Sequence, residues 1–396
     1  MGSALSKENI LQELEKLQKD WENETLPKLT KKNQEGLDLL KNTPLDIALT
    51  GVSGAGKSSL VNALRGMTNW EDGAAETGET ETTMEHKSYP HLTFPNVTMW
   101  DLPGIGTPNF KPEEYLKKVN FEKYDCFIIV ASNRFTENDV LLAREIHKMY
   151  KKFYYVRTKV DASIYSEKQK PNFSEEKFLD GIRKYCCDNL KRIGESNPRV
   201  FLSSAFHLDK YDLPLLLGTL ENELDDLKKH ILILSMPVFS KEVLKKKRAA
   251  MEDYIKKAAW LSCTVRAVPV PGLSVVCDVA ILVRSMIYIL EVFGLDEESL
   301  NRLAKRVGKS VDVLKSAIKK SPLPSQITTG FVISMLSKSV ICGTLMVVET
   351  VLDFVPVLGS ITGGPLSFGT TFYFLKKFLH DAEEDAQNVR AKAAEF

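Results

Sequence analysis

Apolar residues recur at two different spacings in the first half of the chain, and the change between them predicts the fold. Short, mostly apolar runs of strand length occur in LDIALTG, VTMWDLPG, YDCFIIVAS, FYYVRTK and PRVFLSS. Between them lie segments with apolar residues at helical spacing, such as SSLVNALRG and ENDVLLAREIHKMYKK. Strands that alternate with helices predict an α/β domain, here residues 44–222, with a mostly parallel sheet covered by helices on both faces.

The flanking segments follow a helical pattern. Apolar side chains of the N-terminal segment recur among lysines and glutamates, namely Ile10, Leu11, Leu14, Leu17 and Trp21. Pro27 is expected to divide this segment into two helices. After about residue 215, amphipathic helices are predicted in LLLGTLENELDDLKKHIL and SKEVLKKKRAAMEDYIKKAAWL, and a helix–turn–helix pair in EESLNRLAKRVGKSVDVLKSAIKKS. We therefore expect an N-terminal helical segment at 1–43 and an all-α C-terminal domain at 223–396.

Two apolar stretches, residues 268–283 and 354–375, interrupt the C-terminal helices. The second contains no charge and has the length of about 20 residues that a membrane-spanning helix needs. Its prolines and glycines, Pro356 and Gly364 among them, would break a simple spanning helix. The pattern favours a buried helical hairpin over a spanning helix, and a hairpin that dips into a membrane stays a third interpretation.

Composition excludes some classes of protein and adds a hint of lipidation. The net charge of +1 and the absence of a nucleic-acid motif predict no nucleic-acid partner. The 6 cysteines form no C-x-x-C pair, which favours reduced thiols in the cytoplasm over a metal site. The N-terminus MGSALSKENI is too polar for a secretory signal. It fits M-G-x-x-x-[ST], so Gly2 is a candidate for myristoylation, and a plain exposed start is the alternative.

The segment GVSGAGKS (51–58) fits the phosphate-binding pattern G-x-x-x-x-G-K-[ST] between a predicted strand and a predicted helix. Glycines at positions 54 and 56 let backbone N–H groups approach phosphate. Lys57 would contact the β- and γ-phosphates, and Ser58 would bind Mg²⁺. The loop and helix start predict nucleotide contacts from Ser53, Gly54, Ala55, Gly56, Lys57, Ser58 and Ser59.

The segment DLPGIGTP (101–108) follows the second apolar strand. Asp101 fits the acidic residue that holds Mg²⁺, usually through water, and Gly104 can donate its N–H to the γ-phosphate. Many GTP-hydrolysing switches carry a glutamine after this glycine, which orients the attacking water. Here that residue is Ile105, whose side chain cannot hydrogen-bond a water.

The segment TKVD (158–161) predicts the base. The Asp161 carboxylate can accept hydrogen bonds from guanine N1–H and the exocyclic amine, two donors that adenine lacks. The Lys159 stem can cover the base plane. Many GTPases have asparagine where Thr158 stands, so this motif is a variant. Ser204 and Ala205 follow the last strand, where a backbone N–H can meet guanine O6.

With these motifs in order, the chain resembles the immunity-related GTPases. The resemblance extends over GVSGAGKSSLVNALRG, GETETTMEHKSYP, MWDLPGIGTPNF, RFTENDV, YYVRTKVD and FLSSAFHLDKYDLP, and it weakens past about residue 320. The Gly-Lys-Ser loop is similar to that of the effector subgroup. The resemblance implies a GTPase domain joined to one helical domain built from both chain ends. It also implies GTP and GDP as substrate and product, Mg²⁺, a role in cell-autonomous immunity, and dimers or oligomers formed across the nucleotide face in the GTP state.

The resemblance also implies what replaces the missing glutamine. A glutamate two residues before a Thr-Met pair acts in hydrolysis in this family, and that position is Glu81 in ETETTM. Thr83 would sense Mg²⁺, and Glu81, Lys57 and Gly104 would form the catalytic set. A carboxylate can position or deprotonate water. Glu79 is the nearest rival, and a solvated loop that holds Glu79, Glu81 and Glu85 is the alternative.

These observations lead to one expected function and two alternatives. We expect a cytoplasmic, partly membrane-associated enzyme that hydrolyses GTP, self-associates in the GTP state and acts on intracellular membranes. The first alternative is a binding switch that holds GTP and barely hydrolyses it. The second is a membrane scaffold whose C-terminal apolar segments carry the function.

Overall fold

The computed structural model describes most of the chain and divides it into two compact units. The described residues are 26–78, 86–105, 112–149, 153–195, 197–265, 273–341 and 364–395. One unit is Thr43–Val243, called the sheet unit below. The other combines Met1–Asn42 with Leu244–Phe396 and is called the helical unit. Each unit is described by itself.

A mixed sheet organises the sheet unit. Within the described residues it has six strands in the order β2-β3-β1-β4-β5-β6. Their bounds are β1 Leu45–Thr50, β2 Lys87–Pro90, β3 Val97–Asp101, β4 Cys126–Ala131, β5 Phe153–Arg157 and β6 Val200–Leu202. All neighbours pair in parallel except β2, which runs antiparallel to β3. The mostly parallel sheet confirms the predicted α/β class.

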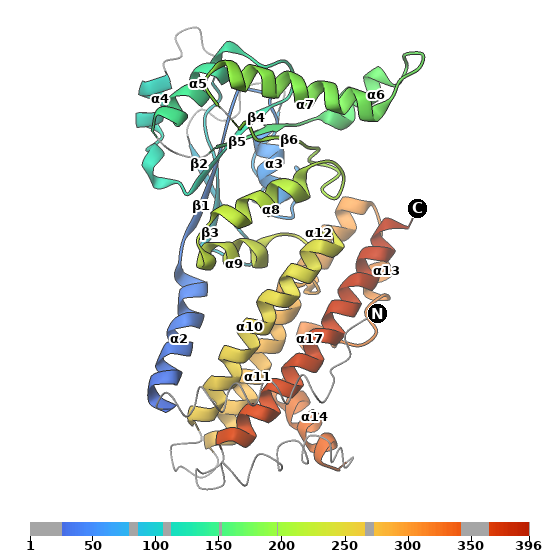
Figure 1. Ribbon diagram of the computed structural model, residues 1–396. Helices are drawn as coiled ribbons and strands as arrows, with labels where there is room; N and C mark the ends of the chain where they lie inside the picture. The colour runs from blue at the N-terminus through green and yellow to red at the C-terminus, as the bar shows by residue number, and fades with distance from the viewer. Residues whose placement is uncertain are drawn as a thin grey trace. The chain divides into compact units, whose positions relative to one another are not determined.

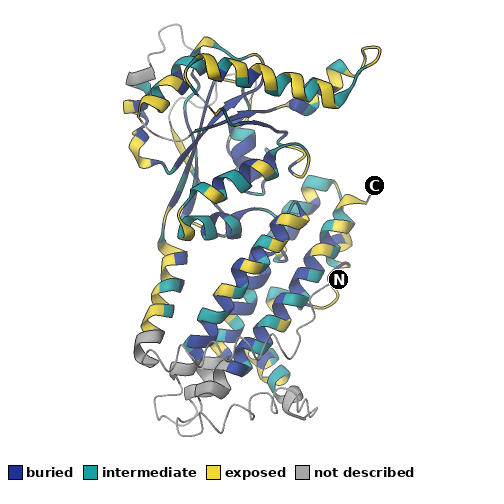
Figure 2. Ribbon diagram, in the orientation of Figure 1, coloured by how far each residue is buried: buried dark blue, intermediate teal, exposed yellow. Residues whose placement is uncertain are grey.

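Helices cover both faces of this sheet (Figure 1). Helices α4, α5 and α7 pack on one face, and α3, α8 and α9 on the other. The helices of this unit are α3 Lys57–Leu64, α4 Pro112–Lys118, α5 Glu137–Lys148, α6 Val160–Glu167, α7 Glu175–Arg192, α8 Leu213–Glu223 and α9 Asp226–Ser235; a 3-10 turn, η1, spans Phe121–Lys123. The strands are mostly buried, as the dark blue in Figure 2 shows, and all of β4 is buried. Burial on both faces explains why the strands appear as continuous apolar runs in the sequence.

The helical unit is all-α within the described residues and combines segments from both ends of the chain. Its elements are α2 Leu26–Asn42, α10 Lys241–Val265, α11 Leu273–Val292, α12 Glu297–Val307, α13 Val311–Lys315, η2 Pro324–Gln326, α14 Thr329–Ile341 and α17 Gly364–Ala394. Helix α11 packs against α14 and α17. Gly308, in the left-handed conformation at φ 66°, ends α12, so α12 and α13 form the predicted helix–turn–helix pair. This arrangement confirms the predicted all-α domain built from both ends.

The boundary after the sheet unit lies later than the sequence predicts. LLLGTLENELDDLKKHIL forms two helices because Asp225 caps α9 with its side chain, which accepts hydrogen bonds from the backbone of Leu227 and Lys228. Helix α9 then packs on β1 and β3. The sheet unit therefore extends to Val243, beyond the expected boundary at residue 222.

Burial also bears on the C-terminal apolar stretch and on a basic run at the start of α10. Residues 354–363 lie outside the described residues, and α17 begins at Gly364 with Phe372 and Leu375 buried in the helical unit. Within the described residues, we find no helix with both the length and the apolar content that crossing a membrane requires. In the basic run SKEVLKKKR, Lys247 is buried and Arg248 forms ion pairs with glutamates of α10 and α17. The run is thus only partly a solvated basic face.

Candidate nucleotide site

The P-loop has the backbone geometry that its sequence predicts. It connects β1 to α3, and Gly56 at the N-cap of α3 takes the left-handed conformation at φ 90°. Gly51 lies so close to β4 that an added Cβ would come within 2.0 Å of the Val130 carbonyl oxygen. Only glycine fits at Gly51, and glycine alone adopts the Gly56 conformation without strain. The N-terminus of α3 therefore faces the loop, as a phosphate site requires.

The three side chains expected to act on phosphate and metal lie at this loop. The Lys57 ammonium donates to the carbonyl oxygens of Gly51 and Val52, each at 3.2 Å. The Ser58 hydroxyl donates to the carboxylate of Asp101 at 2.5 Å, which brings the two predicted metal ligands together. A hydroxyl and a carboxylate are oxygen donors, the kind that Mg²⁺ prefers. These residues therefore fit a Mg²⁺ site.

Ile105 is a core residue. Its side chain is fully buried in the cluster beneath α4, α5 and α7, and its N–H donates to the Gly51 carbonyl at 3.0 Å. Its neighbour Gly104 lies against the P-loop, where an added Cβ would come within 3.1 Å of Ser53. The Gly104 backbone is thus at the loop, while the side chain after it points into the core. The residue that orients water in many GTPases has a packing role here.

The base motif is tied to the P-loop by hydrogen bonds. The buried Thr158 hydroxyl donates to the carbonyl oxygen of Ala55 at 2.5 Å. Lys159, at φ 55°, donates from its ammonium to the Gly54 carbonyl at 3.0 Å. Asp161 lies in the first turn of α6. The Thr158 hydroxyl thus reaches the P-loop from the end of β5.

The loop after β6 lies next to this motif. The N–H of Val160 donates to the Ser203 carbonyl at 3.3 Å. Ser204 is fully buried, and its hydroxyl accepts from the N–H of Phe206 at 3.2 Å. Ala205 is half-buried. The two residues expected at guanine O6 are thus placed beside the segment that carries Asp161.

Most predicted phosphate residues line one pocket. Its described lining is Ser53, Gly54, Gly56, Lys57, Ser58, Ser59, Thr77, Gly78, Gly104 and Lys159. Ala55, within the loop, is buried, and its carbonyl accepts a hydrogen bond from the Thr158 hydroxyl. The lining does not include Asp161, Ser204 or Ala205. Asp101 is also outside it and accepts a hydrogen bond from the lining residue Ser58.

The sequence analysis did not predict two residues of the pocket lining, and several predicted site residues lie outside the described residues. Thr77 and Gly78 were not predicted, although they directly precede the quoted ETETTM segment. The small size of both residues was the only signal for a close approach to the loop. Outside the described residues lie Gly2, Glu79, Glu81, Thr83 and Glu85.

Comparison with known proteins identifies the family. Residues 10–392 match the sequence model of a family described as Interferon-inducible GTPase. The chain belongs to the interferon-inducible GTPase family. As a member of this family, the protein is a GTPase that hydrolyses GTP to GDP and phosphate.

Individual relatives of this interferon-inducible GTPase agree with that assignment. Interferon-inducible GTPase 5 of Rattus norvegicus is 42% identical over 97% of this chain and 83% of its own length. Interferon-gamma-inducible GTPase 10 of Mus musculus is 39% identical over 89% of this chain and 82% of its own length. Among the solved structures that are similar to this chain, Toc33 from Arabidopsis thaliana has a TM-score of 0.33 at 14% identity, over 46% of this chain and 78% of that chain. The assignment therefore depends on the sequence relatives.

Proposed function

We propose that this GTPase uses Mg²⁺, self-associates in the GTP state across its nucleotide face and acts on intracellular membranes in cell-autonomous immunity. In this proposal it is cytoplasmic and partly membrane-associated. The observation that carries the self-association is the burial of Ile105, which removes the usual water-orienting position from the site.

The phosphate end of the site is assigned to residues of this chain. Lys57 would turn its ammonium from the loop carbonyls to the β- and γ-phosphate oxygens. The Gly104 N–H would donate to the γ-phosphate, and Ser58, Thr83 and Asp101 would hold the metal, the last through water. When bound, Mg²⁺ neutralises charge on the phosphate oxygens.

The attacking water needs a group that the described pocket does not supply. Among the described residues, the lining contains no aspartate, glutamate, glutamine or histidine. A carboxylate that acts as a general base on the water typically raises the rate by about 10²–10⁴-fold. Glu81, close in sequence to Thr77 and Gly78 of the lining, is the carboxylate we assign to this role. A second protomer at the nucleotide face would place it on the water, so an isolated protomer would hydrolyse GTP slowly.

Turnover measured over a range of protein concentrations tests the proposal. The specific activity of the unmodified protein should rise with concentration. Glu81→Ala should keep GTP affinity and GTP-dependent self-association, and it should lose most of the stimulated rate, about 10²-fold or more. Glu79→Ala is the matched control and should be much milder.

The outcomes separate the alternatives. A specific activity that does not change with concentration contradicts the role of self-association and favours a binding switch. If Glu79→Ala loses the rate while Glu81→Ala keeps it, the assignment of the carboxylate is wrong. If neither variant changes turnover, backbone groups or the substrate phosphate must orient the water.

A further inference from the structure

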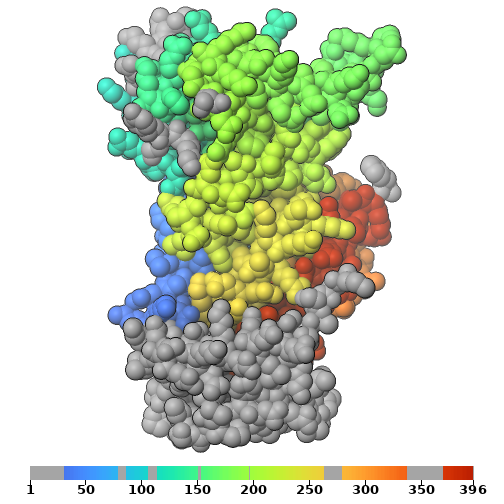
Figure 3. Space-filling model, in the orientation of Figure 1, coloured from blue at the N-terminus to red at the C-terminus, as the bar shows by residue number. Residues whose placement is uncertain are grey.

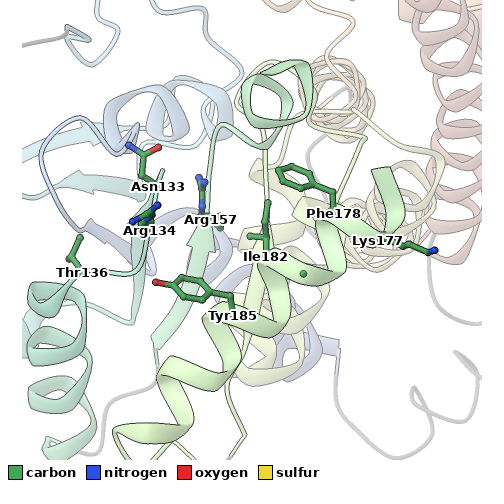
Figure 4. A pocket seen from close by; sticks show the side chains of 9 residues that line it. Asn133, Arg134, Thr136, Arg157, Lys177, Phe178, Ile182 and Tyr185 are labelled. Carbon is green, nitrogen blue, oxygen red and sulfur yellow. The ribbon is translucent and has the colours of Figure 1, made fainter. Parts of the chain in front are cut away.

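A second pocket in the sheet unit shares no lining residue with the nucleotide pocket. Its cavity volume is about 750 Å³, within the range of small-molecule sites. Figure 4 shows Arg157, at the end of β5, between two walls. One wall is the loop after β4 with Asn133 and Arg134, and the other is α7 with Phe178, Ile182 and Tyr185.

Arg157 is a buried cation without a counter-charge in the part of the chain that the structure describes. Its side chain is 8% exposed, and its Nη1 donates to the Thr158 carbonyl at 2.7 Å. Within the described residues the guanidinium makes no other hydrogen bond and no ion pair. Burial raises the pKa of the neighbouring Cys186 to about 12 and also raises the pKa of Tyr155, so both are neutral near pH 7. The guanidinium is therefore desolvated without an anion beside it, which is costly.

The rim of the pocket adds a second cation. Arg134 is exposed and, within the described residues, makes no hydrogen bond or ion pair. Its loop is held by the capping box of α5, in which Thr136 and Asp139 exchange hydrogen bonds. The Lys177 side chain, by contrast, points away from the other labelled side chains (Figure 4). Two arginines on an ordered frame thus face a pocket whose described lining contains no carboxylate.

The wall on α7 is apolar and accessible. Ile182 and Phe178 are half-buried, and the Tyr185 side chain is 45% exposed. In Figure 3 the residues of α7, in light green, lie at the surface of the sheet unit. A ligand can therefore reach the pocket from solvent and bury apolar surface against this wall.

We propose that this pocket binds a small amphipathic anion, whose carboxylate, sulfonate or phosphate pairs with Arg157 and Arg134 and whose aromatic or aliphatic body packs on the α7 wall. The planar guanidinium donates in a fork that matches such oxyanions. The anion would supply the missing counter-charge, and the attraction is strong because the Arg157 side chain is shielded from water.

The test uses a pair of fluorescent probes that differ in one group. 8-Anilinonaphthalene-1-sulfonate carries an aromatic body and a sulfonate, and N-phenyl-1-naphthylamine is the same ring system without the charge. The full-length protein should bind the sulfonate at one saturable site. Arg157→Met and Arg134→Ala should each weaken that binding by about 10- to 100-fold, the effect of losing a hydrogen bond to a charged group. Both should leave the affinity for the neutral probe within about twofold.

Two further variants make the test specific. Tyr185→Ala should weaken the binding of both probes because it removes part of the apolar wall. Lys184→Ala removes an exposed charge on the same helix, outside the pocket lining, and should change the affinity for neither probe. Sulfonate binding that is absent, unchanged in both arginine variants, or weakened equally for the two probes would overturn the proposal. GTP affinity of Arg134→Ala is measured as well and should be unchanged. Unchanged GTP affinity shows that the nucleotide site is intact, so a loss of probe binding is then separate from the proposed GTP chemistry.

Discussion

Thr158 shows at the scale of one residue how two sequence motifs become one site. The P-loop and the base motif are separated by about a hundred residues, and the Thr158 hydroxyl joins them by donating to Ala55. The bond is buried, so water cannot replace it when it is lost. The same hydroxyl also donates to the Ala131 carbonyl at the end of β4, 3.1 Å away. The Thr158 side chain thus connects the base motif both to the P-loop and to the end of β4.

Replacing this hydroxyl with a methyl group should therefore destabilise the protein. Thr158→Val leaves the Ala55 carbonyl without its donor, and we expect a loss of about 1–3 kcal/mol in the free energy of unfolding. GTP affinity should fall as well, because the loop loses the buried one of the two side-chain hydrogen bonds that tie it to the base motif. Denaturant unfolding and calorimetry measure the two effects. Thr219→Val is the control, since that hydroxyl only bonds the Leu215 carbonyl on the surface of α8; equal losses in both variants would contradict the argument.

Asp161 provides a second prediction at this scale. Its place in the first turn of α6, beside the loop after β6, agrees with a role at the base. Asp161→Asn should weaken GTP binding and favour xanthine nucleotides, because the xanthine ring presents a carbonyl to the new amide. A site that depends on such paired bonds can discriminate by about 10⁴–10⁵. Competition among GTP, ATP and XTP checks the prediction, and equal affinity of the unmodified protein for ATP and GTP would refute it.

Helix α10 shows how an element changes the meaning of a charge pattern. Its first turns carry several lysines, yet one of them, Lys247, is buried and donates to the Val292 carbonyl of α11 at 2.8 Å. Desolvation lowers the pKa of Lys247 to about 7, from an ordinary value of 10.5. Between these two values the unfolded chain binds more protons than the folded protein. Stability from this group therefore rises as the pH rises from 7 to 10.5.

An apolar replacement should remove this pH-dependent cost. We expect Lys247→Met to raise the free energy of unfolding by about 1–4 kcal/mol, the range seen when apolar residues replace buried charge. The increase in the free energy of unfolding should be larger at pH 6 than at pH 9. At pH 6 the buried lysine is charged, so the variant removes the full cost of burying that charge. Denaturant unfolding at both pH values measures it. Lys245→Met, at an exposed position of the same helix, should show no such difference, and an equal gain at the two pH values would refute the burial argument.

At the scale of the whole molecule, segments from both halves of the chain belong to the helical unit, while the nucleotide pocket lies in the sheet unit. Proposed membrane action therefore concerns segments of the helical unit and Gly2, which precedes the described residues. One myristoyl chain binds membranes only marginally, with a constant of about 10⁴ M⁻¹, so a second signal is required. The burial of Lys247 and the ion pairs of Arg248 reduce what the basic run can contribute.

Gly2→Ala should consequently reduce membrane association without abolishing it. Cosedimentation with vesicles of acylated protein and of the variant measures the difference. Ser3→Ala is the matched control because the myristoylation pattern leaves that position open. Unchanged association of Gly2→Ala would remove acylation from the proposal, and complete loss would remove the second signal.

The sequence by itself determined the features that depend on local spacing. Continuous apolar runs predicted five of the six described strands, because burial on both faces requires them. The glycine spacing of the P-loop predicted a phosphate-binding turn, because the backbone conformations needed there are set within a few residues. The edge strand β2 was missed, since it is four residues long, ends in proline and lacks a continuous apolar run.

Only the tertiary structure decided which distant segments meet. Ile105 was known to be unable to orient water, and its burial beneath the helices showed what it does instead. The bond from Thr158 to Ala55, the packing of α9 on the sheet and the burial of Lys247 join residues that no sequence period relates. Arg157, whose guanidinium has no counter-charge among the described residues, likewise became recognisable only once β5, α7 and the loop after β4 surrounded it. Burial and partners depend on the packing of the whole unit, and local pattern does not encode them.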